Sequence, residues 1–127
     1  MAKSVISKIM TNLNATFNLR GKSGSQYVFH VHTMNEEHLD ESGIYVFTKR
    51  GLNATSHKYE HKIIHIEKSD SIQKHLYDHH TGDCIDENGC NCVCLKQIEN
   101  ADDRERIESD LLDNYDTVCN EESKLIG

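Results

Sequence analysis

The chain of 127 residues contains no proline and no long apolar run. Because proline is absent, no proline-rich linker marks a boundary between domains, and the length fits one domain with one core. A membrane-spanning helix requires roughly 20 consecutive apolar residues, and no window approaches that length. The first residues are mixed polar and apolar rather than a continuous apolar signal segment. These absences predict one compact, soluble domain that remains in the cytoplasm and does not enter a membrane.

Positive charge is also scarce. The sequence has 21 acidic residues against 14 Lys and Arg, which gives a formal net charge of −7 at pH 7 with neutral histidines. Affinity for duplex nucleic acid comes largely from Lys and Arg that displace counterions from the phosphates. The composition therefore excludes a tight, non-specific duplex binder, and any contact with nucleic acid must use local charge.

Five cysteines are an odd number, and Cys90, Cys92 and Cys94 alternate along one short segment. This pattern is unsuited to a disulfide framework and favours reduced cysteines in the cytoplasm. A zinc site built from Cys84, Cys90, Cys92 and Cys94 is an alternative. Structural zinc sites use pairs of ligands separated by two to four residues, however, so small buried side chains are the preferred interpretation. Cys119 is interpreted as unrelated to the other four.

The hydrophobic periodicity predicts an α+β fold with a small, mainly antiparallel sheet of three to four strands flanked by helices. Strands 43–48 and 59–66 should pair antiparallel, because no crossover helix separates them. We expect residues 1–41 to add a helix and an extra strand, residues 42–120 to form the core domain and residues 121–127 to form a tail. The expected elements are helix 4–14, strands 26–32, 43–48 and 59–66, a helix from residue 69 or 70 to about 82, a loop at 83–89, strand 90–98 and helix 101–115.

Three features of the sequence suggest chemistry on phosphodiesters: the tripeptide 43–45, a histidine-rich segment after it and Glu108. Cleavage of a phosphodiester requires an activated oxygen nucleophile, a cation beside the phosphoryl oxygens and a proton donor for the leaving group. Tyr45 and His65 can share the base and orienting roles. Glu108 can hold one Mg²⁺ or Mn²⁺ ion with waters, and Lys68 or His75 can face the phosphate.

The order of these pieces resembles the GIY-YIG endonuclease superfamily over about residues 42–120. Gly43-Ile44-Tyr45 matches the first tripeptide, and the second falls on His65-Ile66-Glu67, which retains the central Ile. The family places a Lys three residues after the second Tyr, an Arg ten after it and, in some members, a His fourteen after it. Lys68, His75 and His79 occupy those positions.

The resemblance continues on the last predicted helix. Glu108 matches the metal-binding glutamate of the family, and Asn120 follows twelve residues later, where the family often has Asn; Thr117 replaces the usual Pro. The resemblance implies metal-dependent hydrolysis of nucleic acid, with DNA favoured over RNA and with one Mg²⁺ or Mn²⁺ ion bound through Glu108. It also implies structural roles for Gly43 and Asn120.

Two alternatives remain open at this level. His75 replaces the Arg of the family and Glu67 would repel phosphate, so the domain can be a degenerate member that binds nucleic acid or protein without cutting it. The other alternative is a structural or regulatory protein that binds Zn²⁺ through its cysteines and histidines. Each residue also has a plain structural interpretation: Tyr45 and His65 as core side chains and Glu108 as a solvated partner of Arg104.

Overall fold

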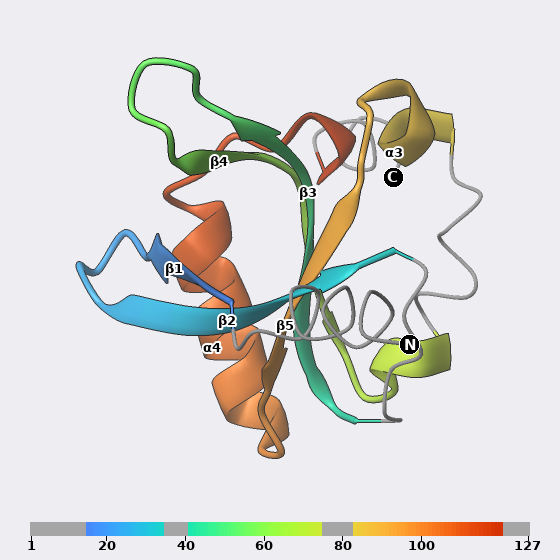
Figure 1. The fold of residues 1–127 in the computed structure, drawn as a ribbon. Helices are drawn as coiled ribbons and strands as arrows, with labels where there is room; N and C mark the ends of the chain where they lie inside the picture. The colour runs from blue at the N-terminus through green and yellow to red at the C-terminus, as the bar shows by residue number, and fades with distance from the viewer. Residues whose placement is uncertain (1–14, 35–40, 75–82, 121–127) are drawn as a thin grey trace, which may run out of the picture.

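The computed structural model describes residues 15–34, 41–74 and 83–120, and they form a sheet with helical elements on both of its faces (Figure 1). In these three ranges, no helix is both long and apolar enough to cross a membrane. The predicted helix 4–14, most of the predicted helix 69–82 and the tail 121–127 lie outside the described residues. The elements are β1 (Thr16–Arg20), β2 (Gln26–Thr33), β3 (Gly43–Leu52), β4 (Tyr59–Ser69), α3 (Asp83–Glu87), β5 (Cys92–Gln97) and α4 (Ala101–Leu112).

The five strands form one sheet in the order β1-β2-β5-β3-β4, and every neighbouring pair is antiparallel. The predicted α+β class and the antiparallel pairing of β3 with β4 are confirmed. The sheet is one strand wider than the upper limit predicted, because β1 was not recognised. It alternates polar and apolar residues but is only five residues long, and it pairs with β2 across a short turn.

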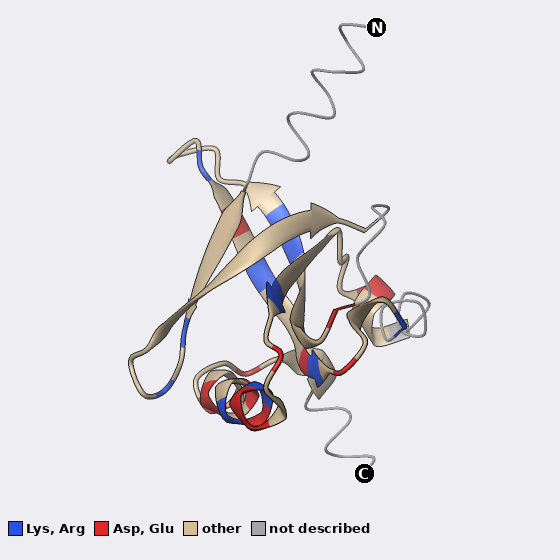
Figure 2. Ribbon diagram, turned by 90° about the horizontal axis from the view of Figure 1, so that it is seen from below, with Lys and Arg blue, Asp and Glu red and all other residues tan. Residues whose placement is uncertain are grey.

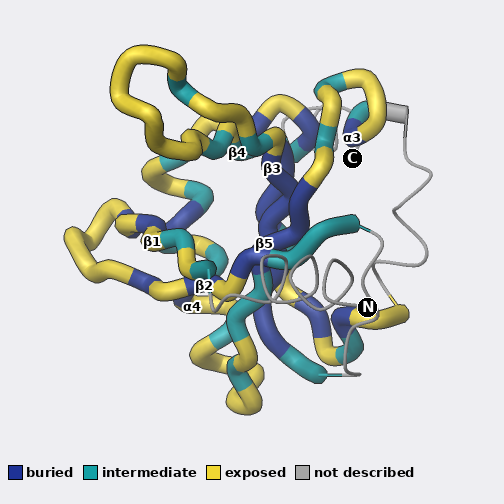
Figure 3. Tube along the Cα trace, viewed as in Figure 1, coloured by how far each residue is buried: buried dark blue, intermediate teal, exposed yellow. Residues whose placement is uncertain are grey.

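Strand β3 lies at the centre of the buried layer. Its first six residues, 43–48, are all buried, and it pairs with β5 along one edge and β4 along the other (Figure 3). The register between β3 and β4 shifts between Phe47 and Thr48, where Phe47 lies opposite His65 but Thr48 lies opposite Ile63. Ile64 is therefore the extra residue of a β-bulge in β4.

Side chains alternate between two buried clusters, one on each face of the sheet. Ile44 and Val46 of β3 point to the face covered by α4, where they pack with Ile107 and Leu111. On the opposite face, the second cluster lies beneath α3 and the C-terminal segment. Its buried members are Tyr45, Phe47, Ile64, Ile72, Ile85, Val93 and Cys119.

Helix α4 begins at the predicted residue, Ala101, and ends three residues earlier than predicted. Asn100 is its N-cap, since the Asn100 side chain accepts a hydrogen bond of 3.0 Å from the Asp103 amide. The helix ends at Leu112, and the hydroxyl of Tyr115, beyond it, accepts a bond from the Arg20 amide. The predicted loop 83–89 contains the short helix α3 instead.

A carboxylate near the end of α4 fastens the turn between β1 and β2. Asp110 accepts bonds from the Ser23 amide at 2.8 Å, the Ser23 hydroxyl at 2.6 Å and the Tyr27 hydroxyl at 2.7 Å. Gly21 lies against the same carboxylate, where an added Cβ would approach Oδ2 to 1.9 Å. The Ser23 hydroxyl, followed by the Tyr27 hydroxyl, lowers the pKa of Asp110.

Replacement of Asp110 by Asn should lower the stability of the fold at neutral pH. A lowered carboxyl pKa adds stability above the ordinary value of 3.8, and that stability is lost as the pH falls through the pKa of the folded state. The urea midpoint of Asp110→Asn should therefore lie below that of the wild type at neutral pH and approach it near pH ~2.5. Asp113→Asn, an exposed change at the same helix end, is the control. A difference that stays constant with pH would contradict this role of the carboxylate.

Candidate functional site

Three side chains of β3 and β4 meet at one carboxylate oxygen. In the antiparallel register, Tyr45 lies opposite Glu67 and Phe47 lies opposite His65, so Tyr45, His65 and Glu67 share a face of the sheet. The Tyr45 hydroxyl donates to Glu67 Oε2 at 2.8 Å, and His65 Nε2 lies 2.9 Å from the same oxygen. We refer to these three residues as the Tyr45 cluster.

The members of the Tyr45 cluster differ in exposure. Tyr45 is fully buried and packs edge-on against Phe47, with ring centroids 5.3 Å apart. The side chain of His65 is 8% exposed and that of Glu67 is 34% exposed. An ionised carboxylate can only accept hydrogen bonds, so His65 donates from Nε2 when Glu67 is charged. Glu67 is therefore the member that a molecule from solvent would meet first.

Glu108 reaches the outer edge of β4 from helix α4, which packs on the other face of the sheet. Its Oε2 accepts a hydrogen bond of 2.6 Å from the Lys68 amide. Burial raises the pKa of Glu108; the Lys68 amide and charge oppose this shift, and the negative charge of Glu67 adds to it. The sequence placed Glu108 near Lys68 and His65, and the structure brings it to the strand that carries both.

Asn120 pairs with the same edge of β4. Its Oδ1 accepts from the Ile66 amide at 2.8 Å, and its Nδ2 donates to the Ile66 carbonyl at 2.9 Å. The Thr117 hydroxyl donates to Asn120 Oδ1 and holds the amide in this orientation. One side chain thus substitutes for a neighbouring strand between His65 and Glu67.

The close approach of β5 requires glycine at position 43. A Cβ at this position would lie 2.0 Å from the Lys96 carbonyl oxygen of β5. Any larger residue would therefore push apart the two strands at the start of the tripeptide. The Lys68 side chain is exposed, whereas His75 and His79 lie outside the described residues.

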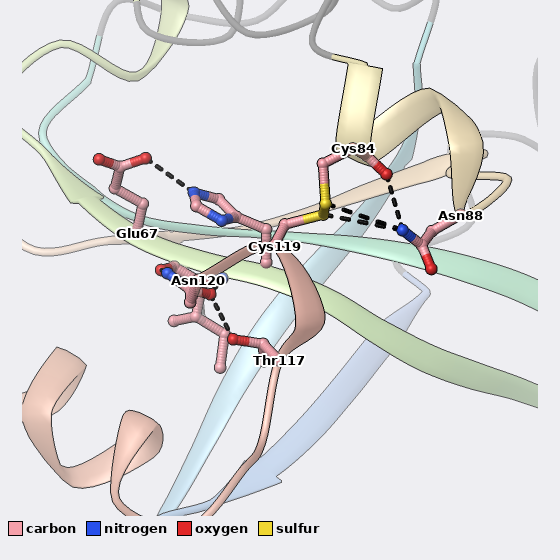
Figure 4. Close-up of a disulfide and its surroundings, with 8 residues drawn as sticks. Glu67, Cys84, Asn88, Thr117, Cys119 and Asn120 are labelled. Atoms are coloured by element: carbon pink, nitrogen blue, oxygen red, sulfur yellow. Dashed lines mark hydrogen bonds and ion pairs between the residues drawn. A yellow bond between two sulfur atoms is a disulfide. The ribbon is translucent and has the colours of Figure 1, made fainter. Parts of the chain in front are cut away.

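A disulfide joins Cys84 of α3 to Cys119, next to Asn120 (Figure 4). Asn88 lies beside it and donates from Nδ2 to the Cys84 carbonyl at 2.7 Å. Two sequence-based interpretations are therefore wrong: Cys119 is not unrelated to the other cysteines, and this pair is not reduced. The pairing joins residues 35 apart in sequence, and cysteine spacing alone does not reveal such a partner.

The four-cysteine zinc set is not assembled. Cys84 is in the disulfide, and the described ranges contain no group of three or more His, Cys, Asp or Glu that could hold a metal ion. Burial raises the pKa of Cys90 to about 11 and that of Cys94 to about 12, so both are protonated thiols near neutral pH. Cys94 is buried and Cys90 is half-buried, and both pack against the core as small side chains.

Glu67 lies at the centre of the Tyr45 cluster, whereas from the sequence it was expected only to repel phosphate. Two signals pointed to it: His65 and Glu67 are two apart on one strand and must share a face, and an antiparallel pairing can set one of them opposite Tyr45. Comparison of the chain with protein-family models, curated proteins and solved structures gave no significant match.

Reduction of the disulfide should destabilise the fold. A cross-link between residues 35 apart restricts the unfolded chain by an amount equivalent to about 3 to 4 kcal/mol. We expect a reductant to lower the free energy of unfolding by that order, measured by urea denaturation. The Cys84→Ala/Cys119→Ala variant should be less stable and insensitive to reductant. Equal stability of the oxidised and reduced wild type would contradict a structural role for this bond.

Proposed function

We propose that this domain hydrolyses nucleic-acid phosphodiester bonds in a metal-dependent reaction at the Tyr45 cluster and Glu108. The observation that carries the proposal is the convergence of Tyr45 and His65 on one oxygen of Glu67, on the strand whose next residue, Lys68, binds Glu108. The resemblance of this residue order to GIY-YIG endonucleases supports it, with DNA as the favoured substrate.

The residues present suit a hard divalent cation. Glu108 supplies a carboxylate oxygen, which Mg²⁺ and Mn²⁺ prefer, and Mg²⁺ commonly binds one or two carboxylates and keeps several waters. The pKa of Glu108 is raised by burial and by nearby Glu67, so its negative charge is poorly compensated by the protein. A bound cation would balance this charge and stabilise the charge that develops on the phosphoryl oxygens.

Within this proposal, Glu67 is the proton acceptor. It is the most exposed member of the Tyr45 cluster and can take a proton from the attacking water as the new phosphorus–oxygen bond forms. Tyr45 and His65 are positioning residues, because both hold Glu67 Oε2 and neither exposes much surface of its own. The exposed Lys68 ammonium would contact the phosphate, and the leaving oxygen would take its proton from solvent.

A second candidate function is a module that binds nucleic acid without cleaving it. Complete burial of Tyr45 favours this function, because a buried hydroxyl bonded to Glu67 cannot itself attack a phosphate. Glu67 also places negative charge beside the position proposed for the phosphate, and without a cation that charge opposes binding. The two candidates therefore differ in whether a divalent ion produces cleavage.

Replacement of Glu108 by Gln should abolish cleavage while the fold is kept. The amide oxygen of Gln can still accept from the Lys68 amide, but the anionic ligand is lost. Because the cation contributes several kcal/mol to charge stabilisation, we expect cleavage to fall by roughly a hundredfold or more. The measurement is nicking of supercoiled plasmid and cutting of a labelled single strand with Mg²⁺ or Mn²⁺.

Glu105→Gln, an exposed change on the same helix, is the matched control and should cleave as the wild type does. Wild-type activity in Glu108→Gln would contradict the assigned metal ligand. A wild-type protein that cleaves neither substrate with either ion would favour the binding module.

Tyr45→Phe should lower the turnover number and leave KM unchanged. The ring is kept, whereas Glu67 loses the hydroxyl that orients it, so we expect a loss of roughly tenfold, equivalent to one ordinary hydrogen bond. Tyr27→Phe is the control, since its hydroxyl also bonds to a carboxylate but lies at Asp110, at the far end of the sheet. Unchanged turnover in Tyr45→Phe would exclude a positioning role.

A further inference from the structure

A groove lies between the β1–β2 ribbon and the outer part of the β3–β4 hairpin. Figure 1 shows this hairpin projecting at the upper left, above the ribbon. The groove has a volume of about 470 Å³, which is the size of a pocket for a small ligand and far too small for a duplex. We call it the hairpin groove. Its lining includes Phe17, Val31, Arg50, Tyr59, Glu60 and His61.

Aromatic rings and one cation dominate this lining. Phe17 and His61 are stacked, with ring centroids 4.3 Å apart and an interplanar angle of 24°. The Arg50 guanidinium carbon lies 4.7 Å from the centre of the Tyr59 ring. Tyr59 is nevertheless 64% exposed, the largest exposed fraction among the large hydrophobic side chains of the described residues. The Tyr59 ring is therefore accessible to a ligand from solvent.

Neighbouring contacts fix the groove before any ligand arrives. Asn91 lies immediately before β5. Its side chain accepts a hydrogen bond from the Arg50 amide at 2.7 Å and donates one to the Arg50 carbonyl at 2.9 Å. The Thr48 hydroxyl lies 2.8 Å from His61 Nδ1 and holds the imidazole. Burial and the Arg50 charge lower the pKa of His61, so its ring is neutral near neutral pH.

The hairpin is basic although the chain is acidic. Residues 48–63 carry four cations, Lys49, Arg50, Lys58 and Lys62, and a single anion, Glu60, while the whole chain has a net charge of −7 (Figure 2). The carboxylate of Glu60 is bonded to Asn53 Nδ2 at 2.9 Å. Lys49 and Lys62 are paired across the two strands and, by the alternation of side chains, lie on the face opposite Arg50 and His61, where they line a second, shallower hollow.

We propose that the hairpin groove binds a short segment of single-stranded nucleic acid. Unpaired bases would stack on Tyr59 and beside the Phe17–His61 pair, and phosphates would contact Arg50. Stacking on aromatic side chains within a positively charged groove is the general mode of single-strand binding. An acidic peptide would use the cations, but it would leave the rings without a matching surface.

The hairpin groove is distinct from the Tyr45 cluster. Tyr45 and Arg50 are five residues apart on β3, or roughly 17 Å along an antiparallel strand. This inference rests on the proposed function in assuming a nucleic-acid ligand. It adds a preference for unpaired strands. Binding can be measured without divalent ions, so its outcome is separate from that of cleavage.

The test is fluorescence anisotropy of a labelled oligothymidylate of about 12 nucleotides, which is within the span of known single-strand sites, with the full chain in EDTA. Tyr59→Leu should weaken binding roughly tenfold, whereas Tyr59→Phe keeps the ring and should bind within about twofold of the wild type. Arg50→Gln should weaken binding and reduce the salt slope by about 0.7 for the lost phosphate contact.

Arg106→Gln, an exposed cation on α4, is the matched control and should bind as the wild type does. Equal affinity of Tyr59→Leu and the wild type would overturn the inference, as would displacement of the probe by polyglutamate as readily as by unlabelled oligothymidylate. Tighter binding of the corresponding duplex would also overturn it. Unchanged binding by a Glu108→Gln protein that no longer cleaves would support the inference, because it would separate the groove from the cleavage site.

Discussion

The hydrogen bonding of β3 along both of its edges positions the rest of the molecule. Six consecutive buried residues, 43–48, lie between β4 and β5, and their side chains supply both core clusters. Tyr45 can meet Glu67 only because this pairing sets the two residues directly opposite each other. Gly43 permits the close approach of β5 that begins the pairing. The backbone pairing at the centre of the sheet thus sets the geometry of the Tyr45 cluster on one of its faces.

Near the C-terminal end of β4, its outer edge is hydrogen-bonded by side chains instead of by another strand. Asn120 pairs with both backbone groups of Ile66, and Glu108 accepts from Lys68. An open edge would be available to pair with other chains, and these contacts occupy it. They come from α4 and from the segment that the Cys84–Cys119 bond ties to α3. The edge is therefore held by covalent and hydrogen-bonded links to both layers that cover the sheet.

Strong local patterns were readable in the sequence, and long-range pairings were not. The apolar run at 43–48 and the Ile-rich segment 63–66 predicted β3, β4 and their antiparallel pairing, because both segments favour strands and no helix intervenes. Strand β1 was missed because its alternation extends over only five residues. The partner of Cys84 and the contact of Glu67 with Tyr45 depend on how distant segments meet, which spacing along one chain does not encode. The roles proposed for Lys68 and Glu108 in catalysis remain predictions.

The extra residue at Ile64 has a consequence for the two faces of β4. Along a regular strand, all odd-numbered residues from 59 to 67 would point the same way. The bulge reverses this order, so Ile63 packs with the cluster beneath α4 while His65 pairs with Glu67 on the opposite face. One strand thereby serves the hairpin groove with its first half and the Tyr45 cluster with its second. If β4 kept Ile64 without the bulge, both sets of side chains would lie on one face of the sheet.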